Sequence, residues 1–329
     1  MLVACASSAP DPEPIVIGLV TKTEENPFFV TLREAAEDLT QELRFELRSY
    51  SGEYDGDNES QVQAIEALVD EGAQAILLTP SDPVALVDSV ARARRAGLLV
   101  IALDTPFARP DQVDATIATD NYRAGQLVGR WARARLGVDA ARAGLVTLDL
   151  SAEQITVDVQ RHQGMLSGFG IEIGDSERKY DERDPRVLGA GATAGSLDGG
   201  RREMLRLARK LPVIRLVYAI NEPAARGARE ALEQLGRAND ILIVTIDGSC
   251  SGVADVAAGR IGATAAQDPV RMVRLALETA LAHLRTGSSP HISPDTDFVD
   301  SGVTLVTDEP VAGLPSIVTS EALERCWGD

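Results

Sequence analysis

Polar side chains follow apolar runs of this sequence at five places, just past the point where each run ends. A carboxylate accepts hydrogen bonds, a lysine donates them and an amide does both. Asp and Asn at such positions also cap helices, and capping explains any single place on its own. Five places drawn from both halves of the chain instead predict one shared cleft for a polar ligand. The residues are Lys22 with Asn26, Asp104 with Thr105, Asn221, Asp247 and Gln267.

Two adjacent phenylalanines, Phe28 and Phe29, follow the first of these apolar runs. Only 4% of the residues are aromatic, so a pair at a strand-to-helix turn is a conspicuous use of them. Open α/β sheets bind ligands at such turns, beyond the carboxyl ends of their strands. Two interpretations remain at this point: the rings plug the core beneath the turn, or they form a platform for a ligand.

Signatures of catalysis are weak. His162, His283 and His291 stand in unrelated contexts, without metal-ligand spacing or a Gly-x-Ser-x-Gly elbow. No Walker A phosphate loop occurs. Residues 189–194 match a dinucleotide fingerprint, but they follow Asp-Pro-Arg at 184–186 where a strand is required. We therefore expect 189–194 to be a loop, and we expect no cofactor, no metal and no enzymatic activity.

Length, charge and composition limit the other classes. The 329 residues suit two domains. The composition is 44% hydrophobic and 25% charged, with no apolar run long enough to span a membrane. The net charge of −18 argues against binding to nucleic acid or to an anionic membrane surface.

Short apolar runs alternate with amphipathic helical periods along the chain, which is typical of βαβ units in a parallel sheet. The rhythm restarts after residue 120, so we expect two similar α/β sheets side by side. Strands are predicted at 15–20, 44–50, 75–79, 98–103, 114–118, 144–149, 176–181, 215–219, 241–246 and 261–266. Helices are predicted from about residue 30 and at 59–71, 83–96, 121–137, 160–170, 200–210, 223–236 and 268–286.

Several motifs together resemble the ribose-binding-protein type of periplasmic sugar receptor, the solute-binding component of ABC importers. The similarity extends from Ile15 to Val306. Within that family, residues 21–23, 220–223, 298–303 and 326–328 most resemble the fructose-type receptors. The family motifs are Ile17-Gly18-Leu19-Val20, Asn26-Pro27-Phe28-Phe29, Leu103-Asp104, Arg161-x-x-Gly164, Tyr218 to Glu222, Val244 to Gly248 and Ala263 to Gln267.

The resemblance implies a type I periplasmic-binding fold, with two doubly wound parallel-sheet lobes joined by a three-crossing hinge. One lobe would comprise 15–118 plus 268–299, and the other 119–267 plus 300–329. The protein would be an extracytoplasmic monomer that closes over a monosaccharide and delivers it to a membrane permease. The resemblance assigns Phe28 and Phe29 to the faces of the sugar. Its hydroxyls would be bound by Asn26, Asp104, Arg161, Asn221, Asp247 and Gln267.

Departures from the ribose-type pattern indicate a different sugar. Thr105 stands where that pattern has an arginine, and Lys22 replaces a small residue. Lys22 either supplies the missing cation or is a solvated loop charge. The third aromatic expected near 194–196 is absent. The similarity to the fructose-type receptors implies that the ligand is fructose or a similar ketose or pentose.

The three cysteines suggest export. Cys5 and the small, polar residues after it resemble the end of a lipoprotein signal, so we expect 1–14 to be a tether lipidated at Cys5. The upstream parts of a signal peptide are missing, so we expect the start to be trimmed or misassigned. Cys250 and Cys326 are a candidate disulfide in an exported protein, and two buried free thiols are the alternative.

Three other functions share features with this sequence. A sugar-responsive transcription regulator shares the expected fold, but it needs a basic helix-turn-helix head before the first strand. A Rossmann-type enzyme needs a nucleotide loop and a base–nucleophile pair. A sensor that partners a chemoreceptor without feeding transport is the closest alternative, and the sequence leaves it open.

Overall fold

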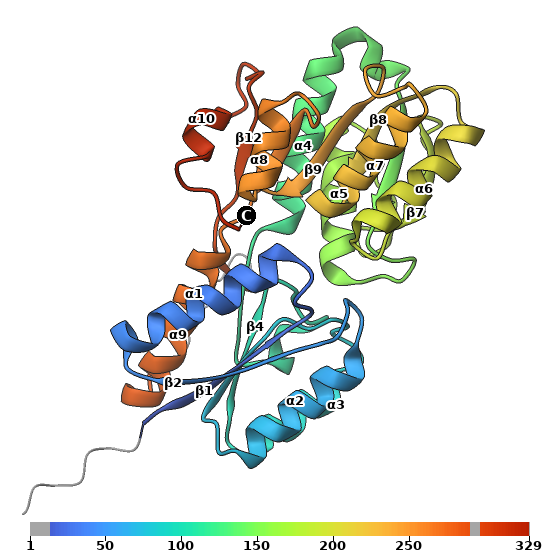
Figure 1. Cartoon of the computed structure of the whole chain (residues 1–329). Helices are drawn as coiled ribbons and strands as arrows, with labels where there is room; N and C mark the ends of the chain where they lie inside the picture. The colour runs from blue at the N-terminus through green and yellow to red at the C-terminus, as the bar shows by residue number, and fades with distance from the viewer. Residues whose placement is uncertain (1–13, 290–296, 329) are drawn as a thin grey trace, which may run out of the picture.

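Two six-stranded sheets, each covered by helices on both faces, make up the computed structural model of the protein (Figure 1). It describes residues 14–289 and 297–328. The candidate lipidation site Cys5 lies outside these residues, as does His291. The expectation of two doubly wound, largely parallel sheets is confirmed.

The first sheet and its helices form what we call the first lobe. Helices α1 (Pro27–Leu43) and α9 (Pro269–Thr286) pack on one face, and α2 (Asn58–Asp70) and α3 (Val87–Arg95) pack on the other. The strand order is β11 (Val299–Asp300), β5 (Ala115–Ala118), β4 (Leu99–Leu103), β3 (Ala75–Leu78), β1 (Val16–Thr21) and β2 (Glu46–Ser51).

The second sheet and its helices form the second lobe. Helices α4 (Asn121–Leu136) and α5 (Thr156–Phe169) cover one face. Helices α6 (Leu197–Lys210) and α7 (Glu222–Gln234) cover the other, joined by part of α8 (Cys250–Ala257). The strand order is β12 (Thr304–Val306), β10 (Ala263–Ala266), β9 (Leu242–Asp247), β8 (Ile214–Ala219), β6 (Gly144–Asp149) and β7 (Val187–Ala192).

The chain passes between the sheets three times: from β5 into α4, from β10 into α9, and from β11 into β12. The hydroxyls of Thr119 and Ser301 lie 3.3 Å apart, so the first and third crossings are hydrogen-bonded to each other. Asp300, which the sequence analysis assigns to the second lobe, pairs instead with Ala118 in the first sheet.

Helix α1 begins earlier than predicted, at Pro27. The Asn26 side chain accepts a hydrogen bond from the backbone N–H of Phe28, and Pro27 occupies the first helical turn, where its missing N–H is tolerated. Phe28 and Phe29 are therefore residues of the helix and not of a preceding loop.

The strand predicted at 176–181 is wrong, and so is the loop predicted at 189–194. Residues 171–186 form an irregular excursion, and the strand is β7, which contains Gly189 and Gly191. A Cβ atom on Gly191 would lie 2.7 Å from the Cβ of Glu203 on α6. The glycines therefore allow α6 to approach the strand closely, and they do not form a phosphate-binding turn.

Candidate functional site

Five charged or amide side chains from both lobes meet where the carboxyl ends of the two sheets face each other. Lys22 and Asp104 follow β1 and β4 of the first lobe, and Arg161 projects from α5 of the second. Asp247 is the last residue of β9, and Gln267 follows β10. Each is only 2–5% exposed. We call these five residues the polar cluster, and the sequence analysis predicted all of them.

The two aspartates of the cluster have unusual backbone conformations. Asp104 has φ of 62° and Asp247 has φ of 140°. Residues other than glycine avoid positive φ, and such strain collects at functional sites where the surroundings hold it in place. Around Asp247 the holding group is Glu222, whose carboxylate accepts hydrogen bonds from the backbone N–H of Gly248 (2.8 Å) and Ser249 (3.1 Å).

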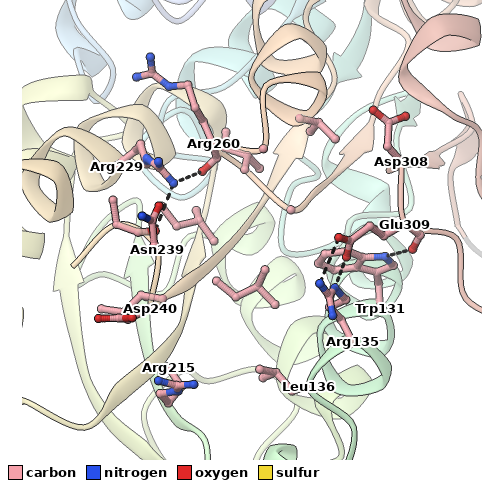
Figure 2. A pocket seen from close by; sticks show the side chains of 18 of the residues that line it. Trp131, Arg135, Leu136, Arg215, Arg229, Asn239, Asp240, Arg260, Asp308 and Glu309 are labelled. Carbon is pink, nitrogen blue, oxygen red and sulfur yellow. Dashed lines mark hydrogen bonds and ion pairs between the residues drawn. The ribbon is translucent and has the colours of Figure 1, made fainter. Parts of the chain in front are cut away.

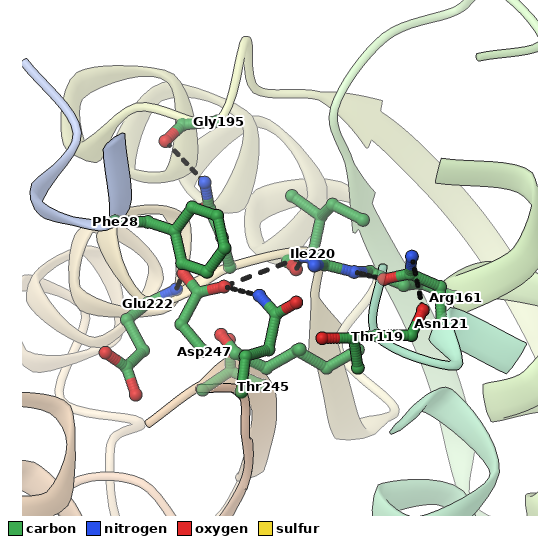
Figure 3. Close-up of polar contacts among 12 residues, drawn as sticks. Phe28, Thr119, Asn121, Arg161, Gly195, Ile220, Glu222, Thr245 and Asp247 are labelled. Carbon is green, nitrogen blue, oxygen red and sulfur yellow. Dashed lines mark hydrogen bonds and ion pairs between the residues drawn. The ribbon is translucent and has the colours of Figure 1, made fainter. Parts of the chain in front are cut away.

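Arg161 lies at the centre of the cluster, where Figure 3 shows it beside Asn121 and Ile220. Its Nε donates to Oδ1 of Asn121 (2.7 Å), and Nη1 donates to the backbone oxygen of Ile220 (3.1 Å). The guanidinium also lies 3.9 Å from Oδ1 of Asp104 and 3.6 Å from Oδ1 of Asp247. These two gaps exceed the 2.7–2.9 Å of a charge-assisted hydrogen bond, about 1 Å short of direct contact.

Like Arg161, Lys22 of the first lobe is a buried cation that lies close to Asp104. Its Nζ lies 4.0 Å from Oδ2 of Asp104 and 5.7 Å from the centre of the Phe29 ring. Because Lys22 is only 2% exposed, it is not a solvated loop charge. Thr105 donates a hydrogen bond to Oδ2 of Asp104 (2.9 Å), so its hydroxyl orients that carboxylate.

Asp247 and Gln267 form a pair whose hydrogen-bonding capacity is not used up. Nε2 of Gln267 donates to Oδ1 of Asp247 (3.0 Å), while the buried Oε1 of Gln267 has no partner among the described residues. Burial raises the pKa of Asp247 to about 6, against the opposing charge of Arg161. Buried polar atoms are rarely left unpaired, so the free Oε1 indicates a place for a donor from a ligand.

Asn26 and Asn221 are helix caps in the structure. Oδ1 of Asn26 accepts from Phe28, as above, and Oδ1 of Asn221 accepts from the N–H of Ala224 (3.1 Å). Nδ2 of Asn221 donates to the backbone oxygen of Gly195 (2.9 Å). The capping interpretation therefore describes these two residues, and their part in binding a ligand stays a prediction.

The phenylalanine pair belongs to the core of the first lobe. Phe28 and Phe29 are 3% and 4% exposed, and their rings meet edge to face with centroids 5.4 Å apart. Phe28 makes a second edge-to-face contact with Trp327 (5.5 Å). Figure 3 shows Phe28 among the site residues, so packing in the core does not remove it from the site.

Two residues at the site were missed by the sequence analysis. Asn121 is buried at the start of α4, and its Nδ2 also donates to the backbone oxygen of Thr119 (3.1 Å). It comes three residues after the end of the apolar strand β5, which is a signal similar to the one that identified the other polar strand ends. Asp55 is half-buried in the turn after β2. Burial raises its pKa, Lys22 lowers it and Asp104 raises it further.

A second buried cluster surrounds His162, the residue after Arg161. Its Nδ1 lies 3.0 Å from Oδ1 of Asp149, and Nε2 lies 3.7 Å from Oε2 of Glu182. Burial lowers the pKa of His162, but the two carboxylates outweigh burial and raise it to about 10. The cluster fastens the 171–186 excursion to β6 and α5.

Cys250 and Cys326 are joined in a disulfide, with their Cα atoms 4.9 Å apart. Of the two alternatives left by the sequence, the structure therefore has the bonded pair. The bond links the first residue of α8 to the C-terminal segment, 76 residues further along the chain.

A cavity of about 560 Å³ lies at the end of the second lobe that is opposite to the polar cluster (Figure 2). It is bordered by Arg215, Leu242 and Gly262, which stand at the amino ends of their strands. Arg135 at its rim is paired with Glu309 (3.1 Å). None of the predicted ligand residues lines this cavity.

Residues 17–288 match the family model described as periplasmic binding protein domain. The ribose import binding protein RbsB of Bacillus subtilis is 28% identical over 83% of this chain and 83% of its own. The D-ribose/D-allose-binding protein of Pseudomonas aeruginosa is 27% identical over 93% of this chain and 95% of its own.

A solved structure with a similar fold is an ABC transporter solute-binding protein from Mycobacterium smegmatis with bound glycerol. It is 26% identical, with a TM-score of 0.78, over 96% of this chain and 99% of that one. The periplasmic component of a sugar transport system from Hahella chejuensis is 29% identical, with a TM-score of 0.76, over 88% and 99% of the two chains.

None of the helices within residues 14–289 and 297–328 has the length and apolar character needed to cross a bilayer. The match to the family model covers most of the chain, and the fold of two sheets with three crossings agrees with it. The chain therefore belongs to the periplasmic binding protein family, in its type I, sugar-binding branch, whose members act outside the cytoplasm and are not enzymes.

Proposed function

We propose that this protein captures a monosaccharide and delivers it to the membrane permease of an ABC importer. The observation that carries the proposal is the polar cluster of Lys22, Asp104, Arg161, Asp247 and Gln267, which is buried and drawn from both lobes. Relatives named for the import of ribose and the binding of ribose and allose support the same class of ligand.

The spacing within the cluster suits sugar hydroxyls. A hydroxyl both donates and accepts, so it can join a cation and a carboxylate that stand 3.6–4.0 Å apart without touching. Lys22 with Asp104, and Arg161 with either aspartate, offer such pairs. The cluster holds two cations and two carboxylates, which fits a neutral ligand.

The apolar faces of a sugar ring would rest against Phe28 and Phe29. Asn26 would add a contact through its Nδ2, and Asn221 would add one through the second hydrogen of its Nδ2, the first being donated to Gly195. Thr105 would act through Asp104, which it already orients (2.9 Å).

We take the sugar to be fructose or a similar ketose or pentose, because of the cation at Lys22 and the neutral Thr105. Relatives named for ribose, allose and apiose fit a ligand of this size. The first lobe would move as one body against the second, and closure would present a shut form to the permease. Anchoring through a lipid on Cys5 and a monomeric state remain predictions.

A thermal-shift screen of purified protein against pentoses, hexoses, ketoses and polyols tests this proposal, because a bound ligand stabilises the folded state. We expect one or a few monosaccharides to raise the melting temperature. Asp247→Ala should abolish the shift, since losing a charge-assisted partner weakens binding roughly ten- to 150-fold. A full shift in Asp247→Ala would refute the site, and no shift with any sugar would refute the function.

A further inference from the structure

The C-terminal tail, residues 307–328, has no part in the function proposed above. It lies beyond residues 17–288, the part that matches the family model. In Figure 1 this red segment passes α10 (Thr319–Ala322) and runs down toward α1 of the first lobe. Near its end Trp327 is only 8% exposed, although most of its neighbours in the tail are open to solvent.

Trp327 contacts three segments that carry predicted sugar ligands. Its ring meets Phe28 edge to face, with centroids 5.5 Å apart. Its indole N–H donates to the backbone oxygen of Gln267 (2.9 Å), and its own backbone oxygen accepts from the N–H of Cys250 (2.9 Å). Cys250 follows closely on Asp247 in the turn after β9. The one side chain thus touches both lobes beside the polar cluster.

The tail is fastened on both sides of this contact. The disulfide to Cys250 holds Cys326, the residue before Trp327. On the other side, a Cβ atom on Gly328 would lie 3.4 Å from the Cβ of Pro27, so the chain rests against the start of α1. An indole held between two fixed neighbours keeps one position at little further cost in entropy.

We propose that Trp327 is a positioning residue of the sugar site, held in place by the Cys250–Cys326 disulfide. Phe28 and Gln267 belong to opposite sides of the hinge, and Trp327 packs on one while it hydrogen-bonds the other. It thereby fixes the positions that the Phe28 ring and the Gln267 backbone take in the closed, sugar-bound form. This inference rests on the proposed function.

The test measures the dissociation constant of the sugar that gives the largest thermal shift, by calorimetric titration. Trp327→Ala should weaken binding about tenfold or more, because ring packing and a hydrogen bond are both lost. Trp327→Phe should fall between that variant and the wild type, since it keeps the ring contact and loses the N–H. Cys250→Ser with Cys326→Ser should weaken binding in the same direction by releasing the tail.

Leu314→Ala is the control for loss of stability alone. Leu314 lies in the tail and packs in the core of the second lobe, away from the polar cluster. This substitution should lower the melting temperature, because a cavity in the core destabilises the folded state. It should leave the sugar affinity within about twofold of the wild type, because the cavity lies away from the site. If Leu314→Ala weakens binding as much as Trp327→Ala does, the effect is general destabilisation and the proposal is overturned.

Fluorescence provides a second readout, because Trp131 and Trp327 are the only tryptophans in the sequence. In Trp131→Phe the sugar should change the emission of Trp327, and in Trp327→Phe the emission of Trp131 should stay constant. If Trp327→Ala binds within about twofold of the wild type while Asp247→Ala has lost binding, the tail has no positioning role. If Asp247→Ala also binds normally, the proposed function itself fails.

Discussion

Charged groups held just beyond hydrogen-bonding distance of one another are the chemical basis of the site. Nζ of Lys22 and the guanidinium of Arg161 both approach Asp104, at 4.0 and 3.9 Å, without bonding it. A ligand that supplies hydroxyls completes these pairs without having to displace a strong bond. Hydrogen bonds between the ligand and these groups should contribute more binding free energy here than at a surface, because the groups are almost entirely removed from water.

Lys22 is the residue that should decide which sugar fits. Replacing it with methionine keeps the stem but removes the cation beside Asp104, so we expect affinity for the best sugar to fall about tenfold or more. The order of preference among epimers should change as well. The measurement is titration of Lys22→Met with the sugars that bind the wild type.

Lys210→Met is the matched control, because Lys210 is exposed at the end of α6. It should bind within about twofold of the wild type. An unchanged affinity and an unchanged order of sugars in Lys22→Met would contradict the role given to this lysine.

His162 should give the free energy of unfolding a characteristic dependence on pH. Its pKa is raised by Asp149 and Glu182 to about 10 from an ordinary value of 6.5. The resulting stabilisation of the folded state is fully present below the pKa that His162 has in the unfolded chain. It is lost as pH rises through the pKa that His162 has in the folded protein. Between about pH 6 and pH 10 we expect a loss of about 2–4 kcal/mol, measured by urea unfolding.

His162→Gln should flatten this part of the pH profile, while His283→Gln on α9 should retain it. Other groups around the imidazole also titrate or carry charge, namely Tyr180, Lys179 and Asp158. The comparison of the two glutamine variants isolates the histidine from them. Equal slopes in His162→Gln and the wild type would rule out the ion pairs as the cause.

Four residues of the polar cluster were predictable because parallel strands bring their carboxyl ends to one edge of a sheet, whereas Arg161, on α5, came only from the resemblance. The place where an apolar run stops was enough to identify Asp104, Asp247 and Gln267. The caps at Asn26 and Asn221 carry the same signal, so the sequence could not separate them from the cluster. Trp327 could not be found this way, because its place depends on the path of the tail.

Helices α4 and α5 pack closely against each other through glycines. A Cβ atom on Gly164 would lie 2.0 Å from the backbone oxygen of Tyr122, and one on Gly125 would lie 2.1 Å from that of Arg161. Helix α4 begins with Asn121 and α5 carries Arg161, so this contact brings the two side chains within hydrogen-bonding distance. The helices therefore position the arginine of the site.

Gly164→Ala should force the two helices apart. We expect the free energy of unfolding to fall by at least about 2 kcal/mol, because the obstructing atoms belong to the backbone and cannot rotate away. Sugar affinity should fall as Arg161 moves. Gly189→Ala is the control, since its Cβ would meet only flexible side chains, those of Leu207 at 3.3 Å and Leu211 at 3.8 Å. A stability change no larger than that of the control would count against the close helix contact.

Most elements were predicted from periodicity alone, and the failures have a physical cause. The excursion at 171–186 is fixed by buried side-chain pairs, such as Lys179 with Asp158, which no local pattern reveals. Strand β7 contains Gly189 and Gly191 where a strand usually has bulky residues, because α6 lies directly on it. Its strand character thus comes from tertiary packing.

On the scale of the whole molecule, three crossings connect the lobes, and side chains such as Asn121, whose Nδ2 donates to the backbone oxygen of Asp104 (3.4 Å), bridge them. The bond between Thr119 and Ser301 ties the first and third crossings together, and Trp327 makes contact with both lobes next to the second, at Gln267. Hinge closure needs only small changes at such crossings, while the sheets move as rigid bodies. Ligand contacts from both lobes would then stabilise the closed form.

Calorimetric titration of the purified protein with the monosaccharides from the thermal screen tests the central claim most directly. The account predicts saturable binding of at least one ketose or pentose, with one site per chain and a dissociation constant of about 10 μM or below. Asp247→Ala should reduce this binding by at least about tenfold. The absence of binding heat with every sugar, or equal binding by Asp247→Ala, would contradict it.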